Sequence, residues 1–264
     1  MRRLVTWVRE SPLEPLDHLG GAALLTGAFL RRVFRRPFET QAFVAEVQRI
    51  GYQSVNVVAL LGLFTGMVMV VQTGETMKRW GAEVYVSEGV ALVLLRELGP
   101  VLAGFLVAGR IGAGIAAEIG AMAVSEQIDA MQSLGADPIK KLVVPKVLAG
   151  MLCLPMLTAL ADVIGIFGGM VMAATMLHVQ PAFYFSRIQQ EVVIGDFMGG
   201  FIKTVVFGGI IAMIACLYGL RTTGGTVGVG RSATQSVVMS CILILAADLI
   251  ITSALVAIFG SGRI

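Results

Sequence analysis

Long uninterrupted apolar stretches dominate the chain from residue 52 onward. A helix needs roughly 20 mostly apolar residues to cross the hydrocarbon core of a bilayer, and five stretches meet that length. They lie at about 52–73, 88–109, 147–177, 197–220 and 236–260. The pattern predicts an all-α polytopic membrane protein with five transmembrane helices, so that the two termini lie on opposite sides of the membrane.

The first 50 residues have a different pattern. The apolar run at 20–30 is too short to cross a bilayer, and it is followed closely by the basic sequence RRVFRR. Four apolar residues then recur at helical spacing: Phe43, Val44, Val47 and Ile50. We expect residues 1–50 to form a cytoplasmic N-terminal segment with an amphipathic interfacial helix whose basic residues face anionic headgroups. A solvated basic tail is the alternative, and residues 51–264 would form the five-span domain.

Composition supports a membrane location and excludes several classes of protein. Hydrophobic residues make up 56% of the chain and charged residues only 14%, against about 25% charged in soluble domains. Soluble enzymes and nucleic-acid binders are therefore excluded as default interpretations. The three cysteines lie in apolar runs and there are two histidines, which favours neither disulfides nor a metal site. No GxxxxGK(S/T), GxSxG or HExxH motif occurs, so we expect no catalytic residues and no enzyme activity.

The distribution of lysine and arginine predicts the orientation in the membrane. Fourteen of these residues fall in the segment before the first span and in the second–third and fourth–fifth connections, whereas four fall on the other side. Loops rich in lysine and arginine remain cytoplasmic. We therefore expect a cytoplasmic N-terminus and a C-terminus outside.

The cytoplasmic connection at 111–146 predicts a short amphipathic helix at about 115–136. Gly135 and Pro138 provide its stop signal. Five of its residues are candidates for docking a soluble ATPase: Glu118, Glu126, Asp129, Met131 and Leu134. The sequence DAMQSLGADP (residues 129–138) resembles in part the loop by which importer permeases dock onto their ATPase. A solvated connecting helix is the alternative.

Five ionisable residues fall within the predicted spans: Arg96, Glu97, Asp162, Lys203 and Asp248. Such residues are costly in a bilayer unless they are paired or hydrated. A charge network of Asp162, Lys203 and Asp248 would be structural, with Lys203 paired to Asp248 or Asp162. Arg96 and Glu97 are candidates for a polar wall facing lipid, with Arg96 offered to a phosphate. Because adjacent helical residues are about 100° apart, we do not expect these two to face one side equally.

Methionines and glycines give further candidates for a lipid cavity and for helix packing. Met69, Met77 and Trp80 could line an apolar cavity for acyl chains, with core packing as the alternative. GxxxG spacing at three places favours close packing of helices within one subunit over a dimer interface: Gly62/Gly66, Gly165/Gly169 and Gly195/Gly199. The sequence GVGRSA (residues 228–233) mimics a dinucleotide fingerprint, but it flanks a membrane span. We expect it to form a cytoplasmic turn, with Ser232 or Thr234 capping the fifth span.

Three segments together resemble the MlaE permease family, the membrane subunits of the maintenance-of-lipid-asymmetry ABC transporter. They are LLRELGPVLAGFLVAGR (94–110), the stretch from GRIGAGIAAEIG to VVPK (109–146), and GGTVGVGRSATQSVV (224–238). The resemblance implies a homodimeric inner-membrane permease that moves phospholipid between the inner membrane and a periplasmic carrier system. It also implies three partners, namely an ABC ATPase subunit, a STAS-domain subunit and a hexameric MCE-domain lipid-binding protein. ATP and magnesium would be bound by the ATPase, and no cofactor by this chain.

Two alternatives remain open at this point. An ABC permease could carry another hydrophobic cargo, such as a solvent or a sterol, because apolar cavities are weakly selective. A secondary carrier driven by ions through Glu97, Asp162 and Asp248 would work without any ATPase. The predicted cytoplasmic helix argues against this carrier, which needs no docking surface.

Overall fold

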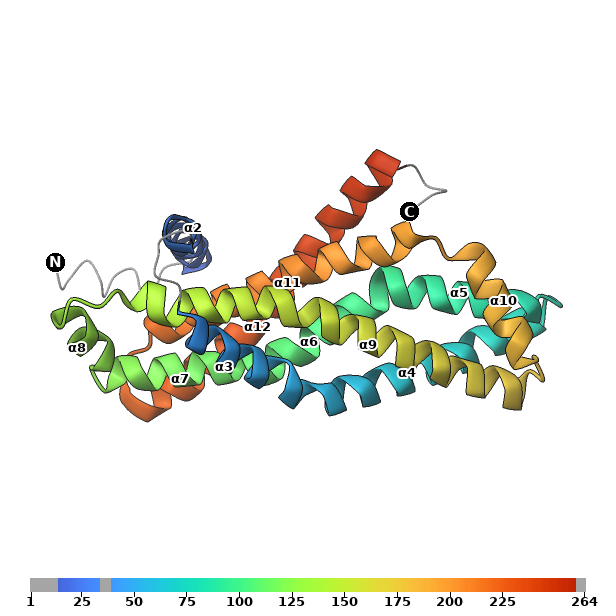
Figure 1. Ribbon diagram of the computed structural model, residues 1–264, viewed down its shortest axis with the longest axis horizontal. Coiled ribbons are helices and arrows are strands. Elements are labelled where there is room, and N and C mark those ends of the chain that lie inside the picture. The colour runs from blue at the N-terminus through green and yellow to red at the C-terminus, as the bar shows by residue number, and fades with distance from the viewer. Residues whose placement is uncertain (1–13, 34–38, 260–264) are drawn as a thin grey trace.

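The computed structural model describes residues 14–33 and 39–259, and these residues form helices joined by short turns, without a strand among them (Figure 1). The expectations for residues 1–13 lie outside this part of the chain. Five segments are long and apolar enough to cross a membrane: Thr40–Lys78, Glu83–Val124, Ile139–Met176, Ile194–Leu220 and Gly225–Ile258. The prediction of an all-α protein with five spans is confirmed.

Several spans are assembled from more than one helical element. The first joins α3 (Thr40–Ile50), η1 (Tyr52–Ser54) and α4 (Val55–Lys78). The second joins η2 (Glu83–Tyr85), α5 (Val86–Val93), η3 (Leu94–Leu98), α6 (Gly99–Val107), η4 (Ala108–Gly112) and α7 (Ala113–Val124). The remaining spans are η5 (Ile139–Val143) with α9 (Val144–Met176), then α11 (Ile194–Leu220), and α12 (Gly225–Phe259). The other helices are α2 (Glu14–Val33), α8 (Gln127–Ser133) and α10 (Pro181–Glu191).

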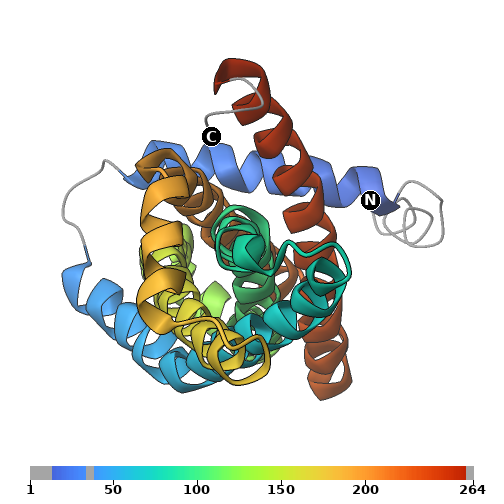
Figure 2. The ribbon, with the colours of Figure 1, turned by 90° about the vertical axis from the view of Figure 1, so that its right-hand side faces the viewer.

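The spans run antiparallel along the long axis of the molecule, with α9 packed against α4, α11 and α3 (Figure 1). The C-terminal half of α12 diverges from the other helices, and α2 crosses them at a steep angle (Figure 2). Apolar side chains such as Leu249 and Ile258 on this part of α12 are exposed. In a bilayer such a face contacts lipid or another protein.

Glycines allow α4 and α9 to approach closely. A Cβ atom on Gly62 would lie 2.3 Å from the carbonyl oxygen of Ala161, and one on Gly66 would lie 1.8 Å from that of Gly165. These contacts place the first two GxxxG pairs within one subunit, as the spacing predicts. Of the third pair, Gly199 is buried in α11 and Gly195 is exposed.

We expect the substitution Gly66→Val to separate α4 from α9 and to lower the free energy of unfolding. Overpacking a core costs about 1–3 kcal/mol, and here the clash is with backbone that cannot rotate away. Gly89→Ala on α5 is the matched control, since a Cβ there meets nothing within 4 Å. Unfolding in mixed detergent micelles measures both variants. Equal stability of Gly66→Val and the wild type would contradict this packing.

The predicted single helix at about 115–136 is wrong, because two helices occupy this region. The α7 helix continues the second span to Val124, and α8 begins at Gln127. Glu126 between them has a left-handed backbone with φ of 58°, which an α-helix does not accommodate. Glu118 therefore belongs to the second span and not to the short helix. The stop is where the sequence predicts it, since α8 ends at Ser133 and Gly135 has φ of 78°.

The predicted turn at residues 228–233 is also wrong. The α12 helix already begins at Gly225, and the turn before it uses Gly224 and Gly225, with φ of 88° and 69°. Glycine adopts positive φ at little cost, so the chain can turn here within two residues. Ser232 does not cap the helix but forms a hydrogen bond of 2.9 Å with Thr222.

Ion pairs connect the N-terminal helices α2 and α3 to ends of the second and third spans. Arg32 on α2 pairs with Asp137, whose other carboxylate oxygen accepts a hydrogen bond of 3.1 Å from the backbone of Ile139. Lys146 on α9 is 2% exposed and pairs with Glu46 on α3 and with Glu118 on α7. Glu118 also forms an ion pair with Arg49 on α3. These basic residues therefore bind carboxylates of the protein itself.

The contact of Asp137 with Arg32 predicts an acid-sensitive attachment of α2. Partial burial raises the pKa of Asp137, but the hydrogen bond and positive charge of Arg32 outweigh it, so the pKa is lowered. The contribution to stability is therefore complete above the unfolded-state pKa of about 4 and is lost as the pH falls through the lower folded value. Because both side chains are partly exposed, we expect no more than about 1 kcal/mol.

We expect a spin label at the exposed Leu24 of α2 to become more mobile as the pH is lowered from 6 through the lowered folded-state pKa of Asp137. In an Asp137→Asn variant the label should be mobile already at pH 6, and the two spectra should converge once Asp137 is protonated. An unchanged acid transition in Asp137→Asn would show that another group controls it.

Candidate functional site

The second span is interrupted at the level of Leu94–Leu98. This segment forms one turn of π-helix, in which the Gly99 N–H donates to the carbonyl of Leu94, five residues earlier. The Gly99 N–H is thereby diverted from the Leu95 carbonyl, and Pro100 has no N–H to donate to the Arg96 carbonyl, so both carbonyls lack their usual helical donor. The Leu95 carbonyl lies against Gly200, where a Cβ would be only 2.2 Å away. The break thus exposes polar backbone to α11.

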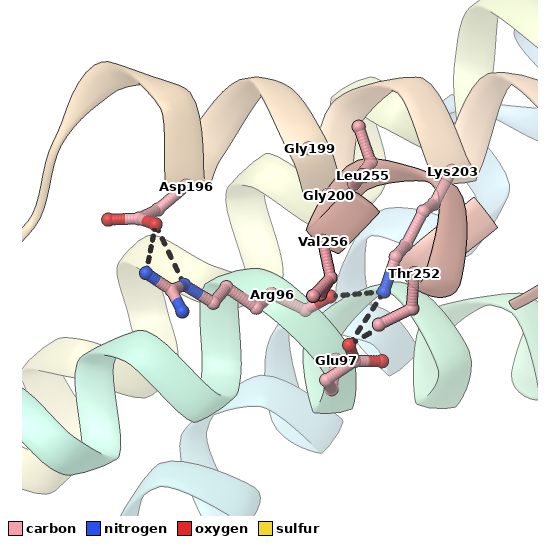
Figure 3. Close-up of a pocket in the computed structure, with 9 residues that line it drawn as sticks. All are labelled: Arg96, Glu97, Asp196, Gly199, Gly200, Lys203, Thr252, Leu255 and Val256. Atoms are coloured by element: carbon pink, nitrogen blue, oxygen red, sulfur yellow. Dashed lines mark hydrogen bonds and ion pairs between the residues drawn. The ribbon is translucent and has the colours of Figure 1, made fainter. Parts of the chain in front are cut away.

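Lys203 on α11 supplies the missing donor. Its Nζ donates to the Arg96 carbonyl at 2.8 Å, and it pairs with Glu97 Oε1 at 2.8 Å (Figure 3) and with Asp248 Oδ1 on α12 at 3.0 Å. The lysine side chain is 3% exposed. A buried ammonium group needs partners on all sides, and this one joins three spans. Thr252 Oγ1 also donates to Glu97 Oε1, at 3.2 Å.

Arg96 contacts the same helix two turns away. Its Nε and Nη2 lie 2.7 and 2.6 Å from Asp196 Oδ1, and the other oxygen of Asp196 accepts from the Val193 N–H at 2.9 Å. Asp196 and Lys203 are seven residues apart on α11, so they share one face. Arg96 and Glu97 therefore both contact this face of α11, at positions two helical turns apart. The long arginine side chain reaches the start of α11, whereas Glu97 reaches Lys203 (Figure 3).

The predicted charge network is present in part. Lys203 pairs with Asp248, one of its two alternative predicted partners, whereas Asp162 on α9 forms no ion pair with it among the described residues. Asp196 is fully buried and was not predicted, because it lies just before the fourth apolar stretch, which begins at about residue 197. Its spacing of two helical turns from Lys203 is the signal that could have identified it.

A small pocket of about 80 Å³ opens beside these charges, between η3, α11 and α12 (Figure 3). Its polar wall includes Arg96 and Glu97, which are 36% and 40% exposed. Its apolar wall is formed by Leu255 and Val256 of α12. The pocket is well below the roughly 300–1,000 Å³ of sites that enclose drug-sized ligands, so one subunit accommodates only a small polar group here.

The other residues predicted to line a lipid cavity, Met69, Met77 and Trp80, do not line this pocket. Met69 and Met77 on α4 pack against a separate apolar cluster that contains Val70 and Tyr184. Trp80 lies in the turn after α4 and is 81% exposed. One copy of the chain therefore does not join them to Arg96 and Glu97 in a single cavity.

The docking candidates lie at the connection between the second and third spans, with the exception of Glu118, which lies on α7 and binds Lys146 and Arg49. Glu126 and Asp129 are exposed, Met131 is partly exposed, and Leu134 is 87% exposed. Asp129 and Met131 lie on the short helix α8, and Glu126 and Leu134 flank it. This helix projects at the end of the molecule (Figure 1). Exposed acidic and apolar side chains thus lie together at α8, whereas Ile128 on the inner face of this helix is buried.

Five apolar spans, a charge cluster at a broken helix and the exposed short helix α8 are the features of a multi-pass membrane protein. The chain belongs to the MlaE family, since the family model described as Permease MlaE matches residues 43–254. It is a transporter component and not itself an enzyme.

Similar proteins occur in bacteria and in a plant. A probable ABC transporter permease protein of Rickettsia typhi is 40% identical, over 90% of this chain and 92% of its own length. The intermembrane phospholipid transport system permease protein MlaE of Haemophilus influenzae is 34% identical, over 83% of each chain. The chloroplastic protein TRIGALACTOSYLDIACYLGLYCEROL 1 of Arabidopsis thaliana is 34% identical, over 87% of this chain and 66% of its own.

Proposed function

We propose that this chain is the permease subunit of an ABC transporter that moves phospholipids between the inner membrane and the periplasm or outer membrane, and so maintains outer-membrane lipid asymmetry. The similarity to the Haemophilus phospholipid permease over 83% of both chains carries this proposal. The subunit would lie in the bacterial inner membrane, with its N-terminus in the cytoplasm and its C-terminus in the periplasm.

The small pocket favours a homodimer as the working unit. A pocket of about 80 Å³ cannot enclose a lipid with two acyl chains, whereas two symmetric copies can form a shared cavity on their two-fold axis. The exposed apolar face of α12 and exposed apolar side chains of α4, such as Leu60 and Phe64, provide surface for its walls. Arg96 would contact the lipid phosphate, because a guanidinium group matches phosphate oxygens in geometry and charge. Glu97 would line the same wall.

Energy would come from a separate ABC ATPase that binds ATP and magnesium and docks on α8. Glu126 and Asp129 would meet basic or polar groups of the ATPase, while Met131 and Leu134 fill an apolar slot. Glu118 would link this contact to α3 and α9 through Arg49 and Lys146. A STAS-domain subunit and a hexameric MCE-domain lipid-binding protein complete the proposed complex.

We expect Arg96→Gln to reduce the amount of phospholipid that copurifies with the protein several-fold, because it removes the charge offered to the phosphate. The control is Arg187→Gln, which removes a pair with Glu88 away from the pocket. Lipid phosphorus per protein measures both. Unchanged phospholipid in Arg96→Gln would contradict a phosphate contact at this residue.

Native mass spectrometry of the complex purified from its membrane tests the proposed function. We expect two copies of this chain with an ATPase, the other proposed subunits and bound phospholipid. A sterol or solvent molecule in place of phospholipid would favour the alternative cargo. A chain that transports in the absence of any ATPase would support the ion-driven carrier and overturn the proposal.

A further inference from the structure

Asp162 is a buried carboxyl group that the charge cluster does not use. It is 4% exposed, and its Oδ1 has no hydrogen-bond partner within the described part of the chain. The carboxyl group packs against the helix break, because a Cβ on Gly99 would lie 1.9 Å from Oδ1. An unpaired polar atom at this depth of a membrane protein requires a partner that the protein side chains do not provide.

Two small cavities of about 10 Å³ each meet at Asp162. One lies between α4, the helix break and α9, and Thr65 lines it. The other lies between α9 and α11, and Thr158 and Thr204 line it. A volume of about 10–15 Å³ is enough for one water molecule, provided that it finds two to four polar partners.

The cavity between α9 and α11 meets that requirement. Both threonine hydroxyls donate to backbone carbonyls of their own helices, Thr158 to Leu154 at 3.0 Å and Thr204 to Phe201 at 2.8 Å. Their oxygens can therefore accept hydrogen bonds from a water molecule. A water that donates both hydrogens to these two oxygens can still accept hydrogen bonds, and only a protonated Asp162 can be the donor among the side chains that line the cavity.

The surrounding charges also favour the protonated form. Asp162 is the only titratable residue among those that line the two cavities from α4, η3, α6, α9 and α11. Across Gly200, which lines both the α9–α11 cavity and the charged pocket, lies the cluster of Arg96, Glu97, Asp196, Lys203 and Asp248. Two cations and three carboxylates already give that cluster a formal charge of −1. An ionised Asp162 would add a second uncompensated negative charge.

We propose that Asp162 is a neutral carboxylic acid that binds a water molecule between α9 and α11. The acid donates to the water, which in turn donates to Thr158 and Thr204. The site connects the third and fourth spans beside the break in the second, without adding a charge to the bilayer.

Infrared difference spectroscopy tests the protonation state, because the C=O stretch of a carboxylic acid is separate from the carboxylate bands. We expect an acid band at pH 7 that is lost in Asp162→Asn. Asp196→Asn is the matched control and should lose a carboxylate band, since that residue pairs with Arg96. Loss of a carboxylate band in Asp162→Asn would overturn the proposal.

A second measurement does not depend on the folding of Asp162→Asn. In a protein labelled with ¹³C-aspartate, the acid band should shift in frequency relative to the unlabelled protein. A labelled Asp248→Asn variant should still show the acid band at the shifted frequency, because Asp162 and not Asp248 gives rise to it. An acid band that does not shift excludes Asp162. Electron density for one water between Asp162, Thr158 and Thr204 in a high-resolution map would support the binding site, and an empty cavity would overturn it.

Discussion

Replacing Lys203 by methionine should lower the free energy of unfolding by about 3–5 kcal/mol, the usual cost of removing one partner from a buried ion pair. Methionine has a similar length, but it leaves the carboxylates of Glu97 and Asp248 beside each other without a cation. It also leaves the Arg96 carbonyl without its donor at the helix break. Unfolding in mixed detergent micelles measures the loss.

A triple variant separates the charge effect from the loss of packing. Lys203→Met combined with Glu97→Gln and Asp248→Asn should recover most of the lost stability, because no unpaired charge remains. Lys78→Met, at an exposed lysine, is the control and should have little effect. If Lys203→Met is as stable as that control, the cluster does not hold the three spans together.

The second large effect is expected at α8. Leu134→Asp should abolish binding of the ATPase, because it places a charge in the apolar slot that Leu134 would fill. Glu126→Lys should weaken binding by at least tenfold, since charge reversal opposes its proposed basic partner. A pull-down of the ATPase on the intact permease measures both, and the five spans should insert normally because no span is altered.

Two comparisons make this test decisive. Met131→Asp should act like Leu134→Asp, whereas Lys203→Met should affect stability without removing the docking surface. Full ATPase binding by both aspartate variants would show that α8 is not the coupling element. The ATPase would then have to contact a different cytoplasmic surface.

The spans could be predicted from sequence because their signal is local. A run of about 20 apolar residues crosses a bilayer almost regardless of its neighbours, so the number and class of helices follow directly. The breaks within the spans were harder to place. The single amphipathic helix expected at about 115–136 is divided by the left-handed backbone of Glu126, a residue type without a strong preference for that conformation.

The ion pairs of the charge cluster could not be predicted by considering each helix separately. Each of its members except Asp196 was recognised as an ionisable residue in a span. Their pairing depends on which helices are neighbours and on the reach of each side chain, neither of which is encoded locally. Arg96 and Glu97 meet one face of α11 because Asp196 and Lys203 are two turns apart. Asp162 was grouped with Lys203 as an ionisable residue of a span, but the partners of Lys203 are Glu97 and Asp248.

Reconstituted phospholipid transfer tests the central claim most directly. The purified complex of this chain with its ATPase and the other proposed subunits is placed in vesicles with a fluorescent phospholipid, and transfer to acceptor vesicles is followed. We predict transfer that requires ATP and that Leu134→Asp abolishes. Transfer that proceeds equally without ATP or without the ATPase, or its absence in the fully assembled complex with ATP, would contradict the account.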